Sequence, residues 1–515
     1  MKNIVICADG TGNTAIKGRG TNVFKLYEAV DQAAHRFKPE LRPQVALYHD
    51  GVGTESFKWL RLLTGATGWG LSRNVKQLYG ELARVYAPGD KIFLFGFSRG
   101  AFTVRTLAGL VHACGILDLS KYPTNEAFDR GVEAAYREYR QQYHSWLTAL
   151  FRPTRKLDAA RVAELRRRFS VRVPEFEGDA PGALIEFMGV WDTVDAVGLP
   201  VRAAEFVNTV IYNFKFPDRT LSTSVGHACH ALALDEERES FAPVLWNESL
   251  TQDPGRIEQV WFAGVHSNVG GGYPRHGMSL LTLDWMMAKS EPHGLRFVEA
   301  ERLSYRYHAD VDDRLYDSRA GIGAFYRWLP RNVRQLCADN GITPRVHRSV
   351  FERIARNTRG YAPGSLPADA EVVSLSRPAA VTEAVRGLVR RQHGAASSLV
   401  EREATTLQLG RWSYWLFVWG MLVTGLLTVK AFVDSALQGT VTWREAVRNA
   451  ADTVISSQWL GLALQTFGRH PWLVAWLALS LALALWVDQR LDRRYSEFWH
   501  DNDLRLRLRK TLGLG

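Results

Sequence analysis

The sequence predicts an α/β protein: a mostly parallel, doubly wound sheet with a helical insertion, followed by a C-terminal hairpin of transmembrane helices. Three observations lead to this prediction. Short apolar runs recur in the N-terminal half, and each ends in a loop that carries glycine, serine, aspartate or histidine. One of these runs passes through Gly-x-Ser-x-Gly directly into a helical pattern. Two uncharged stretches, of 18 and 17 residues, lie in the last quarter of the chain.

The first expected strand is Lys2–Ala8, and Asp9-Gly-Thr-Gly-Asn13 follows at its end. Two glycines at a strand end allow backbone N–H groups to point into a cleft, as the stabilisation of an oxyanion requires. We therefore expect Gly10 and Thr11 to take part in an oxyanion hole. The alternative is a plain turn capped by Asp9. The phosphate-binding patterns G-x-x-x-x-G-K-[ST] and G-x-G-x-x-G are both absent from this segment.

The strand expected at Lys91–Phe97 ends in Gly96-Phe-Ser-Arg-Gly100 and is followed by an alanine- and leucine-rich helix. Strand, Gly-x-Ser-x-Gly and helix, in this order, form the context of the nucleophile elbow of an α/β-hydrolase. The two glycines give the backbone room at the sharp turn. We expect Ser98 to be a nucleophile, with the backbone N–H of Arg99 helping to bind an oxyanion at the helix N-terminus.

A second apolar run, 184–191, ends at Asp192. Doubly wound sheets present functional side chains at the carboxyl ends of their strands, so Asp192 is the expected acid of a catalytic triad. Asp195 is the alternative acid. Asp235 lies in a run of charged residues and is expected on a solvated helix face or in an ion pair.

The expected base is His266, which follows the strand-like run 260–265 and precedes three glycines. His227 and His230 lie in an apolar stretch that we expect to be helical, and histidines in such settings are usually hydrogen-bonded core residues. His112 is expected to pack within the helix after the serine. Serine, aspartate and histidine then occur in the chain order of an α/β-hydrolase triad.

Charge and cysteine content exclude several other classes of protein. The net charge of +11 is explained in part by basic residues near the apolar stretches, so no nucleic-acid partner is expected. The cysteines Cys7, Cys114, Cys229 and Cys337 show no metal-type spacing and no disulfide framework, as suits a reducing cytoplasm. We expect no metal and no cofactor.

The chain divides into three predicted parts. Residues 1–290 are expected to form the catalytic core, within which 119–170 is a helical insertion that serves as a cap or lid or simply packs on the core. Residues 291–405 are expected to be a helical extension of unknown role. Residues 406–515 are expected to be a membrane anchor with a basic C-terminal tail.

The anchor contains two expected transmembrane helices, at about 412–432 and 470–488. Each apolar stretch approaches the ~20 residues that cross a bilayer, and tryptophans lie near their ends. Basic residues flank the pair on both sides: Arg386, Arg390, Arg391, Arg402 and Arg411, then Arg490, Arg493, Arg494, Arg505, Arg507, Arg509 and Lys510. The positive-inside rule then places both termini on the cytoplasmic side of the inner membrane, as a two-pass protein.

Six linked motifs together resemble one family. They are Asp9-Gly-Thr-Gly-Asn13, Tyr48-His-Asp-Gly-Val-Gly-Thr54, Gly96-Phe-Ser-Arg-Gly-Ala101, Gly189-Val-Trp-Asp-Thr-Val194, His230-Ala-Leu-Ala-Leu-Asp235 with Phe241-Ala-Pro-Val-Leu-Trp246, and Gly264-Val-His-Ser-Asn-Val-Gly-Gly-Gly-Tyr273. The family is the α/β-hydrolase family that includes the first class of type VI secretion lipase effectors. The resemblance covers about residues 1–290.

This resemblance implies a phospholipase of A1 or A2 type in which Ser98, Asp192 and His266 form the triad. Asn268 stands where many relatives are expected to carry aspartate. The chain is thus expected to be a membrane-anchored serine hydrolase that cleaves acyl esters of phospholipids through an acyl-enzyme. Its expected partners are a phospholipid membrane and an inhibitory, immunity or regulatory protein, with delivery to a target cell as one biological role. The alternatives are an esterase or thioesterase acting on a soluble substrate, and a non-catalytic membrane scaffold.

Overall fold

The computed structural model describes residues 1–10, 20–50, 69–143, 155, 157–171, 184–194, 219–238, 241–251, 253–318, 330–375, 379–393, 398–437, 457–500 and 502–514. The structural statements that follow concern these residues. Thr11 and Asp195, both predicted site residues, lie outside them.

The centre of the molecule is an eight-stranded sheet, all of whose pairings among the described residues are parallel. The strand order is β2-β1-β3-β4-β5-β6-β7-β8. The strands are β1 (Asn3–Ala8), β2 (Gln44–His49), β3 (Lys91–Phe97), β4 (Ile185–Trp191), β5 (Val225–Ala233), β6 (Ile257–Phe262), β7 (Arg345–His347) and β8 (Glu371–Val373). Most are apolar throughout because helices cover both faces of the sheet.

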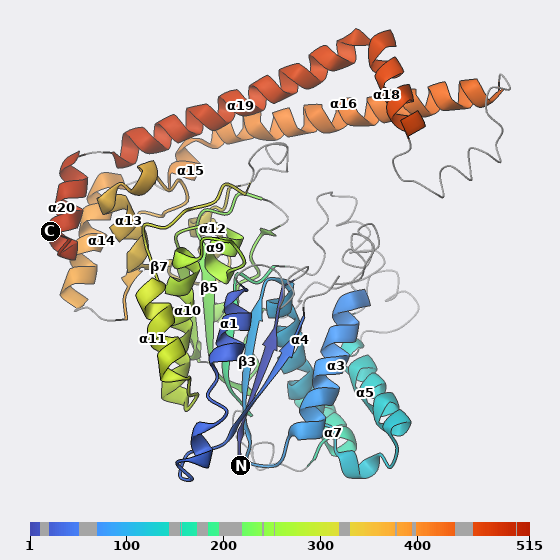
Figure 1. Cartoon of the computed structure of the whole chain (residues 1–515), viewed down its shortest axis with the longest axis vertical. Helices are drawn as coiled ribbons and strands as arrows, with labels where there is room; N and C mark the ends of the chain where they lie inside the picture. The colour runs from blue at the N-terminus through green and yellow to red at the C-terminus, as the bar shows by residue number, and fades with distance from the viewer. Residues whose placement is uncertain are drawn as a thin grey trace.

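Helices lie on both faces, so the predicted doubly wound α/β fold is confirmed (Figure 1). One face carries α3 (Trp69–Val85), α4 (Arg99–Cys114), α5 (Asn125–Arg140) and α7 (Ala159–Phe169), and their apolar side chains share a core with alternate residues of β1, β3 and β4. The other face carries α1 (Asn22–Ala29), α10 (Gly277–Ser290) and α11 (Glu299–His308), around a second core. Short 3₁₀ helices occupy Ala34–Arg36, Leu119–Lys121, Glu248–Leu250, Pro254–Arg256, Glu291–His293 and Thr358–Gly360.

A third core lies beside β6, β7 and β8. Its helices are α12 (Val333–Ala338), α13 (Arg348–Arg356), α14 (Ala379–His393), α15 (Leu399–Arg402) and α20 (Asn502–Leu512). Trp499 is fully buried there, and its indole N–H donates to the carbonyl of Pro363 at 2.8 Å. The end of the chain therefore returns to the body of the protein, as Figure 1 shows for α20 beside α13 and α14.

Two long apolar helices, α16 (Ala404–Leu437) and α19 (Pro471–Trp499), lie side by side and extend away from the sheet (Figure 1). The indole N–H of Trp476 on α19 donates to the carbonyl of Leu416 on α16 at 2.9 Å. The helix α18 (Ser457–Arg469) joins the far end of the pair, where the hydroxyl of Thr428 donates to that of Thr466 at 3.3 Å. The predicted helical hairpin is therefore present, and its helices are longer than the predicted spans of 412–432 and 470–488.

The region 225–232, predicted to be helical, is a strand, β5. The prediction was wrong because a strand buried on both faces is apolar at every position, and a short apolar run does not distinguish a strand from a buried helix by its period. The extension at 291–405 likewise contains two strands in addition to its helices. β7 and β8 each have three residues, which is too short for a periodic signal.

The insertion at 119–170 contributes α5 and α7, which pack against α3 and α4. The hydroxyl of Tyr139 lies where a side chain at Gly109 of α4 would begin, and Arg166 donates to the carbonyl of His112 at 2.9 and 2.7 Å. Residues 144–154 of the insertion lie outside the described residues, so the proposed lid stays a prediction.

Chain order reverses between β1 and β3, which are neighbours in the sheet while β2 lies on the other side of β1. Ligand sites of open α/β sheets lie at such switch points, beyond the carboxyl ends of the strands. In this chain, β1 ends next to Asp9 and β3 ends next to Ser98. The fold thus brings two of the predicted site segments to one place.

Candidate active site

Ser98 lies at the sharp turn between β3 and α4 with φ 57° and ψ −121°, a conformation that residues with a side chain rarely adopt. Its backbone N–H donates to the carbonyl of Trp191 at 3.0 Å, which ties the turn to the end of the neighbouring strand β4. Ser98 is 7% exposed. A strained serine at a strand-to-helix turn is the local geometry of a nucleophile elbow.

The glycines of the elbow allow this turn to form. A Cβ at Gly100 would lie 2.1 Å from the carbonyl oxygen of Ala8, and one at Gly96 would lie 2.7 Å from the backbone of Ala101. Side chains at either position would therefore force the backbone apart. Gly100 in particular allows the start of α4 to approach the end of β1, where Asp9 and Gly10 lie.

The predicted oxyanion donors are in different situations. The N–H of Gly10 donates to the carboxylate of Asp9 at 2.6 Å, so it is already paired in this structure. That carboxylate also accepts from the hydroxyls of Thr21 at 2.5 Å and Tyr48 at 2.8 Å. Arg99 is the first residue of α4, where backbone N–H groups have no partner within the helix. The oxyanion role expected for the Arg99 N–H stays a prediction.

The side chains of Asp192 and His266 meet at the ends of β4 and β6. Nδ1 of His266 lies 2.6 Å from Oδ2 of Asp192, and the two side chains are 5% and 0% exposed. Asp192 comes directly after β4, and His266 begins the short helix α9 (His266–Gly270) that follows β6. With Asp192 bound to Nδ1, Nε2 is the nitrogen that can accept a proton.

Two aromatic rings hold the imidazole in place. The ring of Phe97, the residue before Ser98, lies 4.6 Å from the imidazole between ring centres, and the ring of Phe241 lies at 4.7 Å. Among the described residues, no hydrogen bond joins the hydroxyl of Ser98 to His266. Catalytic hydrogen bonds are often long in unliganded enzymes, so this absence does not rule out a catalytic Ser98–His266 pair. In the structure, the ring contact of Phe97 links the elbow to the imidazole.

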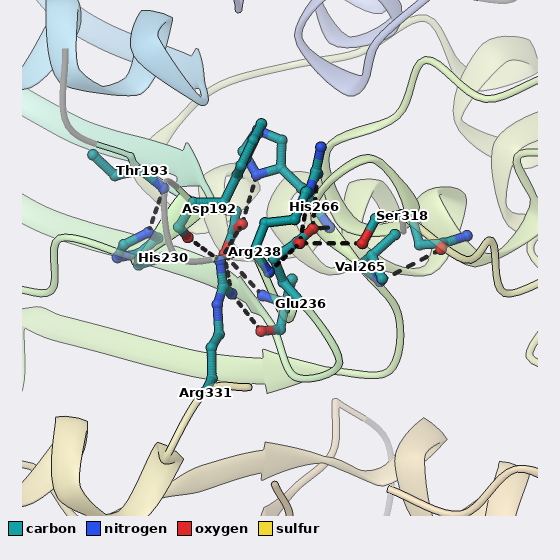
Figure 2. Close-up of polar contacts among 12 residues, drawn as sticks. Asp192, Thr193, His230, Glu236, Arg238, Val265, His266, Ser318 and Arg331 are labelled. Carbon is teal, nitrogen blue, oxygen red and sulfur yellow. Dashed lines mark hydrogen bonds and ion pairs between the residues drawn. The ribbon is translucent and has the colours of Figure 1, made fainter. Parts of the chain in front are cut away.

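Arg331 is a site residue that the sequence analysis missed. Its guanidinium donates to both carboxylate oxygens of Asp192, at 2.7 and 2.9 Å, and to the carbonyls of Ala233 and, at 2.6 Å, Phe241. Figure 2 shows Asp192 between Arg331 and His266. Burial alone would raise the pKa of Asp192, but the charge of Arg331 and the hydrogen bonds from His266 and Arg331 outweigh it and hold that pKa well below its ordinary value. Asp192 is therefore ionised.

Glu236 is a second site residue that the sequence analysis did not name. The charged run that contains it was expected on a solvated helix face or in an ion pair, and Glu236 is fully buried beside the site in an ion pair with Arg238. Its carboxylate accepts the backbone N–H of His266 at 3.1 Å and the guanidinium of Arg238 at 2.8 and 2.9 Å (Figure 2). Burial by itself would raise the pKa of Glu236, but Arg238 lowers it to about 2. The carboxylate thus holds the N-terminus of α9 in place.

The rival residues have structural roles. Nε2 of His230 accepts the N–H of Thr193 at 3.1 Å, and burial together with Arg105 lowers its pKa to about 3, so His230 is neutral and engaged. His112 pairs with the hydroxyl of Ser224 at 2.9 Å, far along α4 from the elbow. Asn268 donates to the carbonyl of Arg314 at 3.0 Å and braces α9.

One cluster in the described part of the chain has the side chains of a metal site. Ligand atoms of His227, Cys229 and Glu258 lie within 4.8 Å of one another. The ammonium of Lys289 already pairs with Glu258 at 2.6 Å, and burial raises the pKa of the Cys229 thiol far above its ordinary value. A cation there would meet a neutral thiol and a neutralised carboxylate, which makes this a poor metal site.

Comparison with known proteins identifies the family of this chain. Residues 2–289 match the model of the catalytic domain of Tle1-like phospholipase effectors of the type VI secretion system. The chain belongs to this family. The resemblance noted in the sequence is thereby confirmed. Arg331, which clamps Asp192, lies beyond the matched Tle1-like domain.

Individual relatives match more weakly. An uncharacterised protein of Saccharomyces cerevisiae, YEL023C, is 26% identical over 253 residues, which are 47% of this chain and 32% of the yeast protein. A crystal structure of an uncharacterised Pseudomonas aeruginosa protein has a TM-score of 0.34 and 18% identity over 76% of this chain and 58% of that one. The Tle1 effector bound to the VgrG spike has a TM-score of 0.28 and 16% identity over 53% and 51%. The chain thus spans about a third to three-fifths of the length of these relatives.

Proposed function

We propose that this protein is a membrane-anchored serine hydrolase that cleaves acyl esters of phospholipids, an activity of phospholipase A type. The observation that supports it best is the buried pair of Asp192 and His266, in which Oδ2 and Nδ1 lie 2.6 Å apart. The pair lies beyond the carboxyl ends of the strands, where Ser98 forms a strained elbow. Membership of a phospholipase family supports the class of substrate.

In the proposed mechanism, Ser98 attacks the ester carbonyl while Nε2 of His266 takes the hydroxyl proton. Asp192 accepts the Nδ1–H bond, which selects the tautomer and stabilises the imidazolium that forms. The backbone N–H of Arg99 binds the oxyanion, together with Gly10 and Thr11 if the Gly10 N–H leaves Asp9 when substrate binds. His266 then returns the proton to the leaving alcohol, and water hydrolyses the acyl-enzyme by the same steps.

Membrane anchoring through α16 and α19 is the second part of the proposal. Ala404–Ala431 and Pro471–Trp499 are long and apolar enough to cross a bilayer, with mean hydropathies of 1.4 and 1.7. In the most apolar 18 residues of each segment, only 22% and 17% of the residues are buried within the protein. Most of their apolar side chains therefore face outward, unlike those of a core helix. Trp412 and Trp472 lie at the start of the two uncharged stretches and are 58% and 47% exposed, which suits a membrane interface.

The basic residues that flank the hairpin favour an orientation in which both termini and the hydrolase domain are cytoplasmic. Family membership suggests delivery into a target cell and control by an inhibitory or immunity protein. In one solved structure a Tle1 effector is bound to a VgrG spike, and a spike of that kind is the delivery partner that we propose for this chain.

The decisive experiment measures fatty-acid release by the full-length protein in vesicles whose phospholipids carry different sn-1 and sn-2 chains. Ser98→Ala should lose release, whereas Ser304→Ala, at an exposed site on α11, should retain it. Turnover of only soluble short-chain esters would favour the esterase. No turnover and no reaction of Ser98 with a fluorophosphonate, in a folded protein, would contradict the hydrolase and leave the membrane scaffold.

A further inference from the structure

A cavity of about 510 Å³ lies where α16 leaves the body of the protein. This volume is in the range of sites for small organic ligands. The cavity is bounded by the segment 242–243, the start of α12, and the first turns of α15 and α16. Its apolar lining includes Ala242, Pro243, Leu336, Val400, Ala404 and Leu407. We call this space the anchor cavity.

The anchor cavity borders the machinery that positions the triad. Arg331 lines it and also holds both oxygens of Asp192. Arg238 lines it and holds Glu236, which binds the backbone of His266. An occupant would therefore contact the residues behind Asp192, on the Nδ1 side of the imidazole, and not the Nε2 side that must face Ser98.

The helix α16, whose first turns bound the cavity, exposes apolar side chains further along. Arg411, which lines the cavity, is followed directly by Trp412, and the outward side of the helix continues with Leu416 and Trp419, which are 37% and 58% exposed. No ion pair of the Arg411 guanidinium occurs within the described parts of the chain, and the side chain is exposed. A cation directly before the interfacial tryptophan of a membrane helix lies at the depth of the lipid phosphates.

We propose that the anchor cavity binds one acyl chain of a membrane phospholipid whose phosphate pairs with Arg411, and that this lipid activates the enzyme by holding Arg331 against Asp192. The bound lipid is an activator, distinct from the ester that is cleaved. The inference rests on the membrane anchoring proposed above. It couples insertion of α16 into a bilayer to the geometry of the triad.

The binding test uses the full-length Ser98→Ala protein, so that it does not depend on hydrolysis. The protein is placed in phosphatidylethanolamine vesicles that contain a diether phosphatidylglycerol with a photoactivatable diazirine in one chain. Labelled peptides should map to 238–243, 330–336 and 400–411. Ala404→Trp, which fills the cavity, should lower this labelling at least about fivefold, and Arg411→Gln should lower it as well.

Matched controls separate these effects from damage to the fold. Thr405→Trp places the same side chain at a neighbouring exposed position outside the cavity. Arg493→Gln removes an exposed arginine near the C-terminal end of α19. Both should label as the parent protein does. If Ala404→Trp leaves the labelling unchanged, the cavity is not the binding site. If free fatty acid competes for labelling as well as a phospholipid does, and Arg411→Gln has no effect, the phosphate does not pair with Arg411.

The activation test uses p-nitrophenyl butyrate, a soluble ester, with the otherwise wild-type protein in detergent or in diether-lipid nanodiscs. Nanodiscs should raise kcat several-fold for the wild type and Thr405→Trp but not for Ala404→Trp. A rate that is the same in detergent and nanodiscs would overturn activation. Failure to hydrolyse any ester would contradict the proposed function, while the labelling result would still decide whether the cavity binds lipid.

Discussion

Arg331 binds both carboxylate oxygens of Asp192, at 2.7 and 2.9 Å, in a contact that is almost completely buried. Asp192 in turn binds His266 at 2.6 Å on its other side. A buried carboxylate that accepts hydrogen bonds from a guanidinium on one side and from an imidazole N–H on the other remains ionised, and its two oxygens cannot rotate between them. Arg331 lies after the Tle1-like domain, which ends at residue 289. The segment that follows the domain therefore contributes directly to the predicted triad.

Replacing Arg331 by glutamine should lower kcat about 10²-fold or more, because orientation and ionisation of the acid would both be lost. The variant should also lose roughly 3–5 kcal/mol of stability, since it leaves a buried charge poorly paired. Arg334→Gln removes a half-exposed partner of Glu401 and should change neither quantity. Full activity in Arg331→Gln would contradict a positioning role for Arg331.

The pH dependence of the same variant is a separate prediction. The folded protein lowers the pKa of Asp192 below its value in the unfolded chain, so the stabilisation is present above ~pH 4 and is lost as the pH falls further. Without Arg331 the pKa rises. The acid limb of the kcat/KM profile should therefore move to higher pH in Arg331→Gln, and an unmoved limb would show that Arg331 does not control the ionisation of Asp192.

Asparagine substitutions distinguish the two candidate acids. Asp192→Asn should lower kcat by about 10³- to 10⁴-fold, because the amide no longer selects the required tautomer of His266. Asp195→Asn should retain most of the activity. Both rates are measured as fatty-acid release from the same vesicles. The opposite pattern would assign the acid to Asp195.

The strain at Ser98 predicts a difference in stability between two inactive variants. Glycine tolerates φ 57° and alanine does not, so Ser98→Gly should be more stable than Ser98→Ala by about 1 kcal/mol, or ~2 °C in Tm. At Ser304, inside the helix α11, the order should reverse because glycine disfavours helices. Equal Tm values for the two Ser98 variants would mean that the elbow is not strained.

Asp235 predicts a pH-dependent stability. Burial raises its pKa to about 6, despite hydrogen bonds from the N–H of Gly264 at 2.6 Å and the hydroxyl of Tyr361 at 2.9 Å. A carboxyl whose pKa is raised on folding stabilises the folded state below ~pH 4, and this stabilisation is lost as the pH rises through 6. Asp235→Asn should flatten the fall of Tm between pH 4 and 7, whereas Asp339→Asn, at an exposed site, should leave it unchanged.

The membrane anchor can be tested with single charges. Leu422 on α16 is 53% exposed and lies near the middle of the expected span. Arginine there should cost about 2.5–3.5 kcal/mol of insertion free energy and should increase the fraction extracted by alkaline carbonate. Leu506→Arg, in the exposed part of α20, should remain in the membrane fraction. Complete extraction of the wild-type protein would contradict the anchor.

The strand ends and the elbow were predictable because their signals are local. Gly-x-Ser-x-Gly between an apolar run and a helix needs no distant partner to be recognised. Asp192 follows directly after β4, and His266 follows shortly after β6. The hairpin was predictable for the same reason, since an uncharged stretch of nearly 20 residues by itself indicates a long apolar helix. The strand β5 was not, because complete burial removes the alternation that marks a strand.

The sequence by itself therefore determined which strand ends carry site residues, where the sharp turn lies and where the apolar helical hairpin lies. All of these depend on residues close together in the chain. Only the tertiary structure decided which charged groups meet. Arg331 and Asp192 are 139 residues apart, and Glu236 reaches the backbone of His266 across 30 residues. Such pairs depend on the path of the chain through the sheet, and a charged residue in a sequence carries no mark of whether it faces water or a buried partner of opposite charge.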